Sequence, residues 1–284
     1  MNGRFAPSPT GVLHLGNLRT ALLAWLFARS AGSSFAVRIE DLDTGRVRAH
    51  FVTEQLDDLA AIGLDWDGPV WMQSQRTAAY EAALSRLPVY ECFCTRAEIR
   101  ESASAAHGPV GVYPGTCLGL SVADRAAKLA EGRRPALRVR AGAARVRFVD
   151  RLKGPQAGVV DDFVVRRNDG AHAYNLAVVV DDTAQGVQEV VRGDDLLDST
   201  PRQIWLHRTL GSPEPSYAHV PLVLGADGRR LAKRHGDVTL RDLDPRDAVA
   251  WMARSLGYRG ATASELLEEF DPDALPREPT TFAA

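Results

Sequence analysis

The sequence has 284 residues, of which 45% are hydrophobic and 25% charged, so it can form the core of one large domain or two modest ones. Its formal net charge of −2 excludes a protein that coats nucleic acid generally, and any nucleic-acid contact must be a local basic patch. Three cysteines are too few for a disulfide framework, and there is no signal-peptide pattern or run of about 18 apolar residues, which predicts a cytoplasmic protein without a membrane span.

Residues 1–65 alternate between strand and helix patterns. A short strand at 4–6 precedes a helix that stops at Gly32 and whose apolar stripe consists of Leu15, Leu18, Leu22, Trp25 and Leu26. Residues 35–40 alternate apolar and polar as a strand does, and a second helix should run to about Ile62, with a glycine as its stop. This alternation predicts an α/β fold with a doubly wound parallel sheet.

Residues 88–117 break this alternation and carry all three cysteines, so we expect an insertion there. A Ser-x-x-Asp pattern predicts a short helix over 121–132, and residues 135–180 are strand-rich, with a turn at 168–170. A helical pattern follows over 196–210, and the rest reads as a tight turn, short helices and a polar tail.

The loop between the first strand and the first helix is the first candidate for ligand binding. Ligands bind at the carboxyl ends of strands in open α/β sheets, and a helix N-terminus there offers N–H groups to phosphate. His14 can donate to phosphoryl oxygens, and Gly16 would let a flat base approach the backbone closely. The plain alternative is a loop rich in proline and glycine with an incidental histidine.

A basic cluster follows the tight turn at 226–228 and consists of Arg230, Lys233 and Arg234. Adenylyl transfer needs cations that neutralise the charge developing on pyrophosphate, and a lysine on a loop suits that task. The alternative is a solvated basic turn.

The two stretches together resemble the paired signature motifs of the class I aminoacyl-tRNA synthetases. His14-Leu15-Gly16-Asn17 resembles the motif HIGH, with Asn17 in place of the final histidine. Arg230-Leu231-Ala232-Lys233-Arg234 resembles the motif KMSKS, with Arg230 and Ala232 in place of a lysine and a serine. The resemblance implies that His14 and Lys233 are catalytic. It also implies that ATP binds with Mg²⁺ beside His14, Gly16, Asn17, Arg230, Lys233 and Arg234.

Further stretches over roughly residues 3–245 are similar to the glutamyl branch of that family: Arg4 to Gly11, Arg38 to Asp43, Tyr174 to Asp182 and Val191 to Leu196. The sequence ends soon after this region, and we expect a compact core without the anticodon-binding region of full-length glutamyl-tRNA synthetases. Such short relatives are implied to attach glutamate to the modified base queuosine of tRNA(Asp).

The resemblance also implies a division into domains. We expect a Rossmann-type catalytic domain at 1–87 and 172–235, split by an acceptor-binding-like insertion with a zinc site at 88–171. A short helical stem-contact region and tail should occupy 236–284.

A glutamate pocket needs a partner for one ammonium and two carboxylates. Glu40, after the second strand, suits the ammonium, and the planar forks of Arg4 and Arg192 suit carboxylates. Tyr174 offers a hydroxyl, and the cradle is completed by Phe5, Ala6, Pro7 and Ser8. Three alternatives stay open: Glu40 pairs with Arg38 or Arg46, Arg192 pairs with Asp194 or Asp195, and Tyr174 is an ordinary strand aromatic.

The cysteines Cys92, Cys94 and Cys117 could meet around one structural zinc, which prefers four ligands. Zinc favours imidazole as well as thiolate ligands, which suggests His107 as the fourth ligand, whereas the family resemblance implies Tyr113. The alternative is a set of free buried cysteines.

The expected partners are ATP, L-glutamate and tRNA(Asp) bearing queuosine. The protein itself is expected to be a monomer. Residues 125–153 carry ten lysines or arginines and only two acids, and could contact RNA phosphates. Two other functions compete with this one. The first is a truncated glutamyl synthetase that charges a tRNA 3′ end, and the second is a catalytically silent module that binds nucleotide, zinc and RNA.

Overall fold

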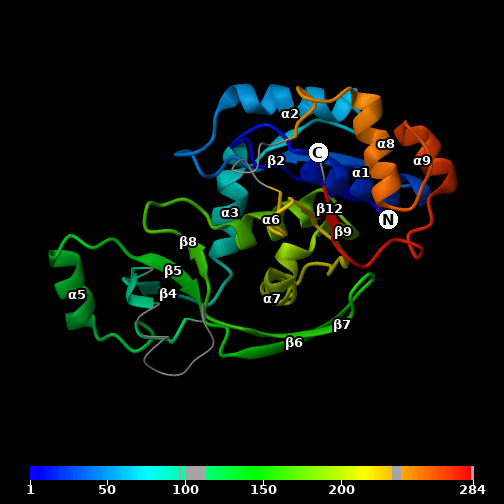
Figure 1. The fold of residues 1–284 in the computed structure, drawn as a ribbon. Coiled ribbons are helices and arrows are strands. Elements are labelled where there is room, and N and C mark those ends of the chain that lie inside the picture. Colours follow the sequence, from blue (N-terminus) through cyan, green and yellow to red (C-terminus); the bar gives the residue numbers. More distant parts are fainter. Residues whose placement is uncertain (96, 100–112, 232–237, 283–284) are drawn as a thin grey trace.

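The computed structural model describes residues 1–95, 97–99, 113–231 and 238–282. Figure 1 shows a sheet with helices on both sides and, on the left of the view, a smaller part built from α5, β4, β5 and β8. Within the described ranges, no helix is both long and apolar enough to span a bilayer.

The central sheet is parallel. Its strands β1 (Gly3–Phe5), β2 (Phe35–Ile39) and β3 (Trp71–Met72) pair in that order, and β9 (Glu189–Gly193) pairs in parallel with β10 (Ser216–Val220). The carbonyl of Asn2 accepts the N–H groups of Gln188 and Glu189 at 2.9 and 3.2 Å, which places β9 beside β1. The predicted doubly wound parallel sheet is therefore confirmed, and its strand order reverses between β1 and β9.

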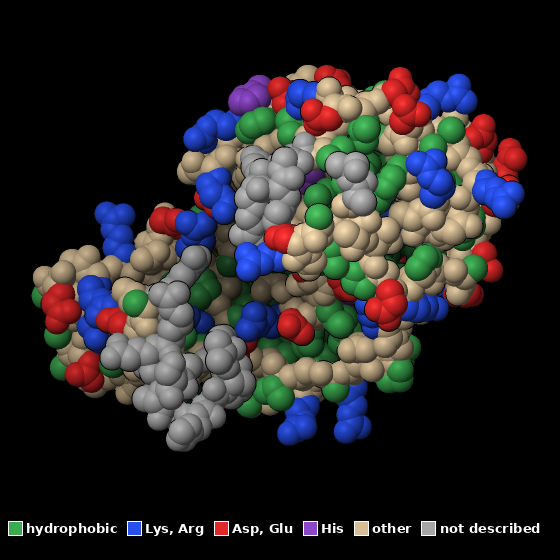
Figure 2. Space-filling model, viewed as in Figure 1, with side chains coloured by type: hydrophobic (Ala, Val, Ile, Leu, Met, Phe, Trp, Pro, Cys, Tyr) green, Lys and Arg blue, Asp and Glu red, His purple; other side chains and the backbone are tan. Residues whose placement is uncertain are grey.

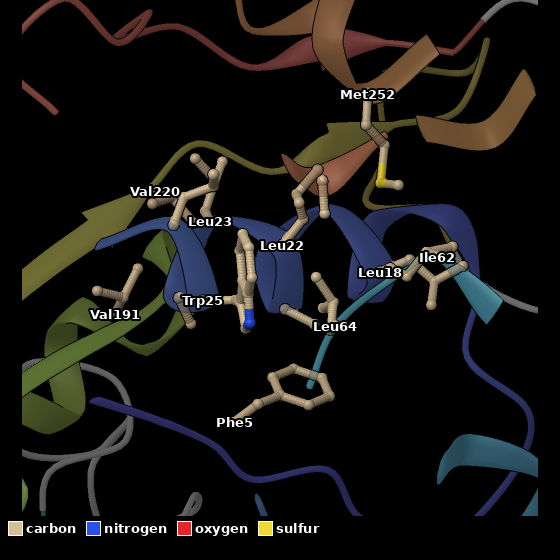
Figure 3. Packing of buried hydrophobic residues seen from close by; sticks show 14 of the residues in the cluster. Phe5, Leu18, Leu22, Leu23, Trp25, Ile62, Leu64, Val191, Val220 and Met252 are labelled. Carbon is tan, nitrogen blue, oxygen red and sulfur yellow. The ribbon is translucent and has the colours of Figure 1, made fainter. Parts of the chain in front are cut away.

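The helix α1 (Leu15–Ser30) lies at the centre of the larger core. Its predicted apolar stripe is buried, but so are Leu23 and Phe27 on its other side. Figure 3 shows side chains from several elements surrounding it, among them Phe5, Val191, Val220 and Met252. The helix is covered all round because the sheet lies on one side and α8 (Pro245–Ser255) and α9 (Ala263–Glu269) lie on the other. This burial fixes the N-terminus of α1 at the carboxyl edge of the sheet.

The remaining helices of the larger part follow the predicted pattern in most places. The second predicted helix is α2 (Ala49–Ala61), and Gly63 follows it with a φ of 82°. A 3₁₀ turn η1 (Gln73–Arg76) leads into α3 (Thr77–Leu84). The helical pattern at 196–210 begins as a 3₁₀ turn η2 (Asp194–Ser199) and becomes α7 (Thr200–Leu210) at a proline in its first turn.

One prediction of secondary structure is wrong. Residues at the end of the strand-rich region form the helix α6 (Tyr174–Ala184). Its run of valines favours a strand locally, but Leu176, Val178 and Val179 pack into a buried cluster with side chains of α7 and β9. Packing therefore overrides the weak intrinsic preference of these residues. Tyr174 is consequently the first residue of a helix and not a strand aromatic.

The smaller part contains an antiparallel sheet of β4 (Val89–Cys92), β5 (Ala136–Val139) and β8 (Val164–Arg166). The helix α5 (Val122–Ala130) begins at the predicted capping box of Ser121 and Asp124. The turn predicted at 168–170 is present, with Gly170 at a φ of 90°.

A long hairpin connects the two parts. It consists of β6 (Ala144–Asp150) and β7 (Gly154–Val160), and Asp150 at the end of β6 pairs in parallel with Tyr217 of β10. The short strands β11 (Val223–Leu224) and β12 (Thr280–Thr281) pair near the C-terminus. Because the hairpin joins the central sheet, part of the expected insertion contributes to the larger part, and the domain boundaries stay a prediction.

Candidate active site

A cavity of about 650 Å³ lies where the carboxyl ends of β1, β2 and β9 meet the N-terminus of α1. This is the point where the strand order reverses, which is where ligands bind in open α/β sheets. Every described residue of the predicted ATP and glutamate sites lines it: Arg4, Phe5, Ala6, Pro7, Ser8, His14, Gly16, Asn17, Glu40, Tyr174, Arg192 and Arg230. Lys233 and Arg234 lie outside the described residues.

His14 is the N-cap of α1, and its position determines its protonation. Its Nδ1 accepts the N–H of Asn17 at 3.2 Å. Burial, together with the charge of Arg230, lowers the pKa of His14 to about 4, so the ring is neutral near pH 7. A neutral ring that accepts at Nδ1 carries its proton at Nε2. Nε2 can therefore donate to a phosphoryl oxygen in the cavity.

Gly16 supports this arrangement for a reason that differs from the expected one. A Cβ at this position would lie 3.1 Å from the ring atoms of His14, which is tighter than ordinary contact. The missing side chain therefore leaves room for the capping ring, whether or not a base also approaches the backbone.

The flanks of the basic motif lie close to this helix N-terminus. The N–H of Leu15 donates to the carbonyl of Val238 at 2.9 Å, and Thr239 forms a bridge with His14. Arg230 forms an ion pair with Asp195, which also lines the cavity. The two motifs that lie far apart in the sequence are thus brought to one edge of the sheet.

Glu40 lies at the edge of a buried network of charges. Its Oε1 accepts a 3.4 Å hydrogen bond from Arg38, which donates to Asp182 at 2.7 Å. Arg46, the other partner considered, pairs with Asp43 at 3.4 Å. Burial raises the pKa of Glu40, and the nearby arginines oppose this rise. A ligand ammonium would stabilise a carboxylate that burial disfavours.

Arg4 does not present the open fork that the sequence predicts. Its Nε and NH2 groups donate to the two carboxylate oxygens of Asp182 at 3.2 and 3.4 Å, and its NH1 group donates to the carbonyl of Val191 at 3.4 Å. The residue lines the cavity, but its charge is already compensated inside the protein. The assignment of Arg4 to a glutamate carboxylate stays a prediction, with Asp182 as a partner that already holds its guanidinium.

Arg192, on β9, is 5% exposed, and its guanidinium faces neutral acceptors. Its Nε donates to Nε2 of His219 at 3.0 Å, its NH1 group to Gln203 at 2.7 Å, and its NH2 group to Thr200 at 2.8 Å. Its remaining contacts are long, at 3.4 Å to the Tyr174 hydroxyl and 3.5 Å to a backbone carbonyl. Such long hydrogen bonds are weak and easily replaced by contacts to a ligand.

The expected alternative partners of Arg192 are engaged elsewhere. Asp195 pairs with Arg230, and Asp194 accepts from Lys153 at 2.8 Å. Among the described residues, no carboxylate forms an ion pair with Arg192. A buried positive charge without a partner is costly, and a ligand carboxylate in the cavity would supply one.

A second, larger cavity of about 1240 Å³ adjoins the first and shares Ser8, Glu40, Arg46 and Tyr174 with it. It extends to the cysteine cluster, and further arginines line it: Arg133, Arg134, Arg138 and Arg167. In Figure 2, basic side chains gather around the hollow between the two parts of the molecule. The two cavities together form a groove that could hold a small substrate at one end and a polyanion along its length.

Ion pairs occupy part of the basic stretch at 125–153. Arg133 pairs with Glu98, Arg151 with Glu189, and Lys153 with Asp194. Arg145 and Arg147 are exposed on the β6–β7 hairpin. Local charge density in the sequence therefore overstated the basic surface that this stretch offers to RNA.

The three cysteines converge in the smaller part. Their sulfur atoms lie within 4.8 Å of one another, and Sγ of Cys94 is 3.5 Å from Sγ of Cys117. Thiolates about 2.3 Å from a tetrahedral zinc lie about 3.8 Å apart, so this spacing fits such an ion. The cluster is consistent with a zinc site.

Tyr113 approaches the same point. Its hydroxyl oxygen is 3.4 Å from Sγ of Cys92 and 3.9 Å from Sγ of Cys94, and it accepts the N–H of Cys117 at 2.8 Å. The guanidinium carbon of Arg138 lies 3.7 Å from the centre of its ring. Burial raises the pKa of Tyr113, so the phenol would lose its proton only when its oxygen binds a cation. The alternative ligand, His107, lies outside the described residues.

Sequence reasoning missed the buried residues behind the site. Asp181 accepts from Gln73, Arg76 and Tyr80, and Asp182 joins Arg4 to Arg38. Asp181 and Asp182 directly follow an apolar run, and this was the available signal of burial. Charged residues are rarely buried without partners, so partners for both could have been expected. Asp150 and His219 gave no such signal, because each stands alone in a strand pattern.

The fold and the site define a class of protein. Residues 1–277 match the family "tRNA synthetases class I (E and Q), catalytic domain", and the chain belongs to that family. A glutamate tRNA ligase from Elizabethkingia meningosepticum, solved in complex with its amino acid, is 27% identical and has a TM-score of 0.84, covering 100% of this chain and 67% of that one. The glutamate-tRNA synthetase from Elizabethkingia anophelis has a TM-score of 0.86 at 26% identity, covering 100% and 68% of the two chains.

Closer relatives define the branch. The glutamyl-Q tRNA(Asp) synthetase from Nocardia farcinica is 60% identical over 98% of this chain and 91% of its own length. The glutamyl-Q tRNA(Asp) synthetase from Symbiobacterium thermophilum is 47% identical over 99% of this chain and 96% of its own length. Within the class I synthetases, the chain therefore belongs to the glutamyl-Q tRNA(Asp) synthetases.

Proposed function

We propose that this enzyme activates L-glutamate with ATP as glutamyl-adenylate and transfers the glutamate to the queuosine base of tRNA(Asp). The observation that carries the proposal is the convergence of Glu40 and the uncompensated Arg192 on one cavity that His14 also lines. A ligand with an ammonium and a carboxylate matches these charges, and the donor at His14 matches a phosphate. The family of the chain and its similarity to glutamyl-Q tRNA(Asp) synthetases support the same reaction.

In the proposed activation step, an oxygen of the α-carboxylate of glutamate attacks the α-phosphorus of ATP, and pyrophosphate leaves. No protein nucleophile is needed, so catalysis consists of positioning and of stabilising the developing charge. His14 donates from Nε2 to a phosphoryl oxygen, and Gly16, Asn17 and Arg230 flank the nucleotide. Lys233 and Arg234 are assigned to pyrophosphate on the sequence motif alone. Mg²⁺ bound with ATP would neutralise phosphate charge.

In the same proposal, Glu40 holds the ammonium of glutamate, Arg192 holds a carboxylate and Tyr174 contributes its hydroxyl. The backbone from Phe5 to Ser8 forms the floor, where Gln55 of α2 holds the loop by donating to the carbonyls of Ser8 and Gly11 at 3.1 and 2.7 Å. Arg4 lines the same cavity and is assigned to the other carboxylate of glutamate, with Asp182 holding its guanidinium.

The transfer step uses a hydroxyl of the cyclopentenediol of queuosine, which attacks the acyl carbon of the adenylate so that AMP leaves. An anticodon loop offers unstacked bases, which is the usual target of sequence-specific RNA recognition. The arginine-lined groove beside the activation cavity could hold the RNA backbone. We also propose one structural zinc held by Cys92, Cys94 and Cys117 with Tyr113, and a cytoplasmic monomer as the working form.

The activation step predicts glutamate-dependent exchange of pyrophosphate into ATP without any RNA. Glutamine should exchange at least about 100-fold less well, because its amide leaves Arg192 without an anionic partner, at a cost of roughly 3 kcal/mol. The measurement is exchange of labelled pyrophosphate with each amino acid at matched concentration. Equal exchange with the two amino acids would remove Arg192 from its role, and no exchange with either would reject activation altogether.

The acceptor distinguishes the proposal from the competing function, charging of a tRNA 3′ end. Labelled glutamate should enter tRNA(Asp) from cells that make queuosine and should not enter tRNA(Asp) from cells that lack it. Labelling of both preparations, or of tRNA(Glu), would favour the competing function.

A further inference from the structure

His219 is a fully buried histidine behind the cavity. It lies on β10, next to Arg192 on β9, and Asp150 at the end of β6 lies on its other side. The three residues are 0%, 5% and 1% exposed. His219 does not line the cavity, so it reaches a substrate only through Arg192.

The hydrogen bonds of Asp150 determine which ring nitrogen of His219 carries the proton. Oδ1 of Asp150 accepts the backbone N–H groups of Leu152 at 3.0 Å and Lys153 at 2.9 Å. Both oxygens accept the backbone N–H of His219 at 3.2 Å, and Oδ2 lies 2.6 Å from Nδ1 of the ring. A carboxylate in this setting only accepts, so Nδ1 must donate.

The other ring nitrogen must then accept. With the proton at Nδ1, the neutral ring has a lone pair at Nε2, which receives the Nε–H of Arg192 at 3.0 Å. Burial lowers the pKa of His219, Arg192 lowers it further, and Asp150 opposes the change. The ring is therefore neutral near pH 7, as this chain of hydrogen bonds requires.

We propose that Asp150 and His219 are positioning residues that fix the orientation of Arg192 towards the substrate carboxylate. The inference rests on the proposed function, in which Arg192 binds glutamate. Asp150 selects the ring tautomer, and the ring holds the stem of the guanidinium through Nε. Each of the two outer nitrogens makes one short hydrogen bond, to Gln203 or Thr200, and one long contact, to Tyr174 or Leu196, that a ligand can replace.

Asp150→Asn tests this chain without changing the size of any side chain. The backbone donors of Leu152 and Lys153 keep the amide oxygen on their side, so the new NH₂ group faces Nδ1 of His219. Nδ1 must then accept, and the proton moves to Nε2, where it faces the Nε–H of Arg192. Two donors cannot bond to each other, so Arg192 should lose its Nε contact, and its orientation should be less fixed although Gln203 and Thr200 still hold its outer nitrogens.

The expected result is a 10- to 100-fold rise in the KM for glutamate in pyrophosphate exchange, while the KM for ATP changes by less than about threefold. His219→Leu should show the same split. His219→Gln should recover most of the loss, because a glutamine oxygen can accept at about the place of Nε2. Asp57→Asn, an exposed acid on α2, is the matched control for the amide substitution.

A second measurement reads the tautomer itself. In protein labelled with ¹⁵N-histidine, the His219 signals, assigned by their loss in His219→Gln, should show the proton at Nδ1 in the natural protein and at Nε2 in Asp150→Asn. An unchanged tautomer together with an unchanged KM for glutamate would overturn the proposal. So would an equal loss for glutamate and ATP with a lower melting temperature, which indicates a purely structural role. Absence of exchange in the natural protein would instead reject the proposed function.

Discussion

Arg192→Met is expected to lower kcat/KM for glutamate in pyrophosphate exchange by roughly 10²- to 10³-fold. Leaving a buried charge without its partner costs about 3–5 kcal/mol, and each 1.4 kcal/mol corresponds to a factor of ten. Methionine keeps most of the length of the side chain but removes the positive charge that the substrate carboxylate would compensate. The affinity for ATP should be retained, because the nucleotide is assigned to other residues, His14 and Gly16 at the N-terminus of α1.

Two further variants separate charge from geometry. Arg192→Lys keeps the charge but loses the planar fork, so we expect a smaller loss that falls mainly on the KM for glutamate. Arg208→Met on α7 removes an exposed arginine that pairs with Glu214 and should behave like the natural protein. A folded Arg192→Met enzyme with an unchanged KM for glutamate would show that another group binds the carboxylate.

Cys117→Ser is expected to reduce bound zinc from about one ion per chain to none and to lower the melting temperature by roughly 10 °C, or about 3 kcal/mol. The sulfur of Cys117 lies 3.5 Å from that of Cys94, so its removal opens one side of the cluster, while the backbone N–H that donates to the Tyr113 hydroxyl stays. Elemental analysis after dialysis against a weak chelator and thermal unfolding measure the two effects.

The fourth ligand is decided by a matched pair of variants. Tyr113→Phe should lower the affinity for zinc, whereas His107→Ala should leave it unchanged. Loss of zinc in His107→Ala alone would assign the position to the histidine. Natural protein that contains no zinc after expression in zinc-supplemented medium would leave three free cysteines as the correct description.

The sequence was most informative where local pattern and global fold agree. The alternation over residues 1–65 predicted the parallel sheet, because period-two strands and a buried helix leave different apolar patterns. His14 and Glu40 were proposed because they follow the first two strands at the edge where ligands bind, and Arg192 because of its planar fork and the resemblance to the glutamyl branch. The capping box at Ser121 is a local signal, and it predicted the start of α5 correctly.

Features that the sequence analysis missed depend on contacts between residues distant in sequence. The carboxylate that holds Arg4 belongs to Asp182, a residue 178 positions away. The helix at Tyr174 follows from packing against α7 and β9, which outweighs a local run of valines. The chain from Asp150 through His219 to Arg192 joins three strands, and no short-range pattern could reveal it.

The central claim concerns the atom that receives glutamate. The direct measurement incubates the enzyme with ATP, glutamate and queuosine-bearing tRNA(Asp), digests the RNA with a nuclease and determines the masses of the fragments. We predict that one glutamyl group is added to the anticodon fragment that carries queuosine and that the 3′ terminal adenosine is unmodified. Glutamate on the 3′ terminal adenosine, or on tRNA(Asp) that lacks queuosine, would contradict the account.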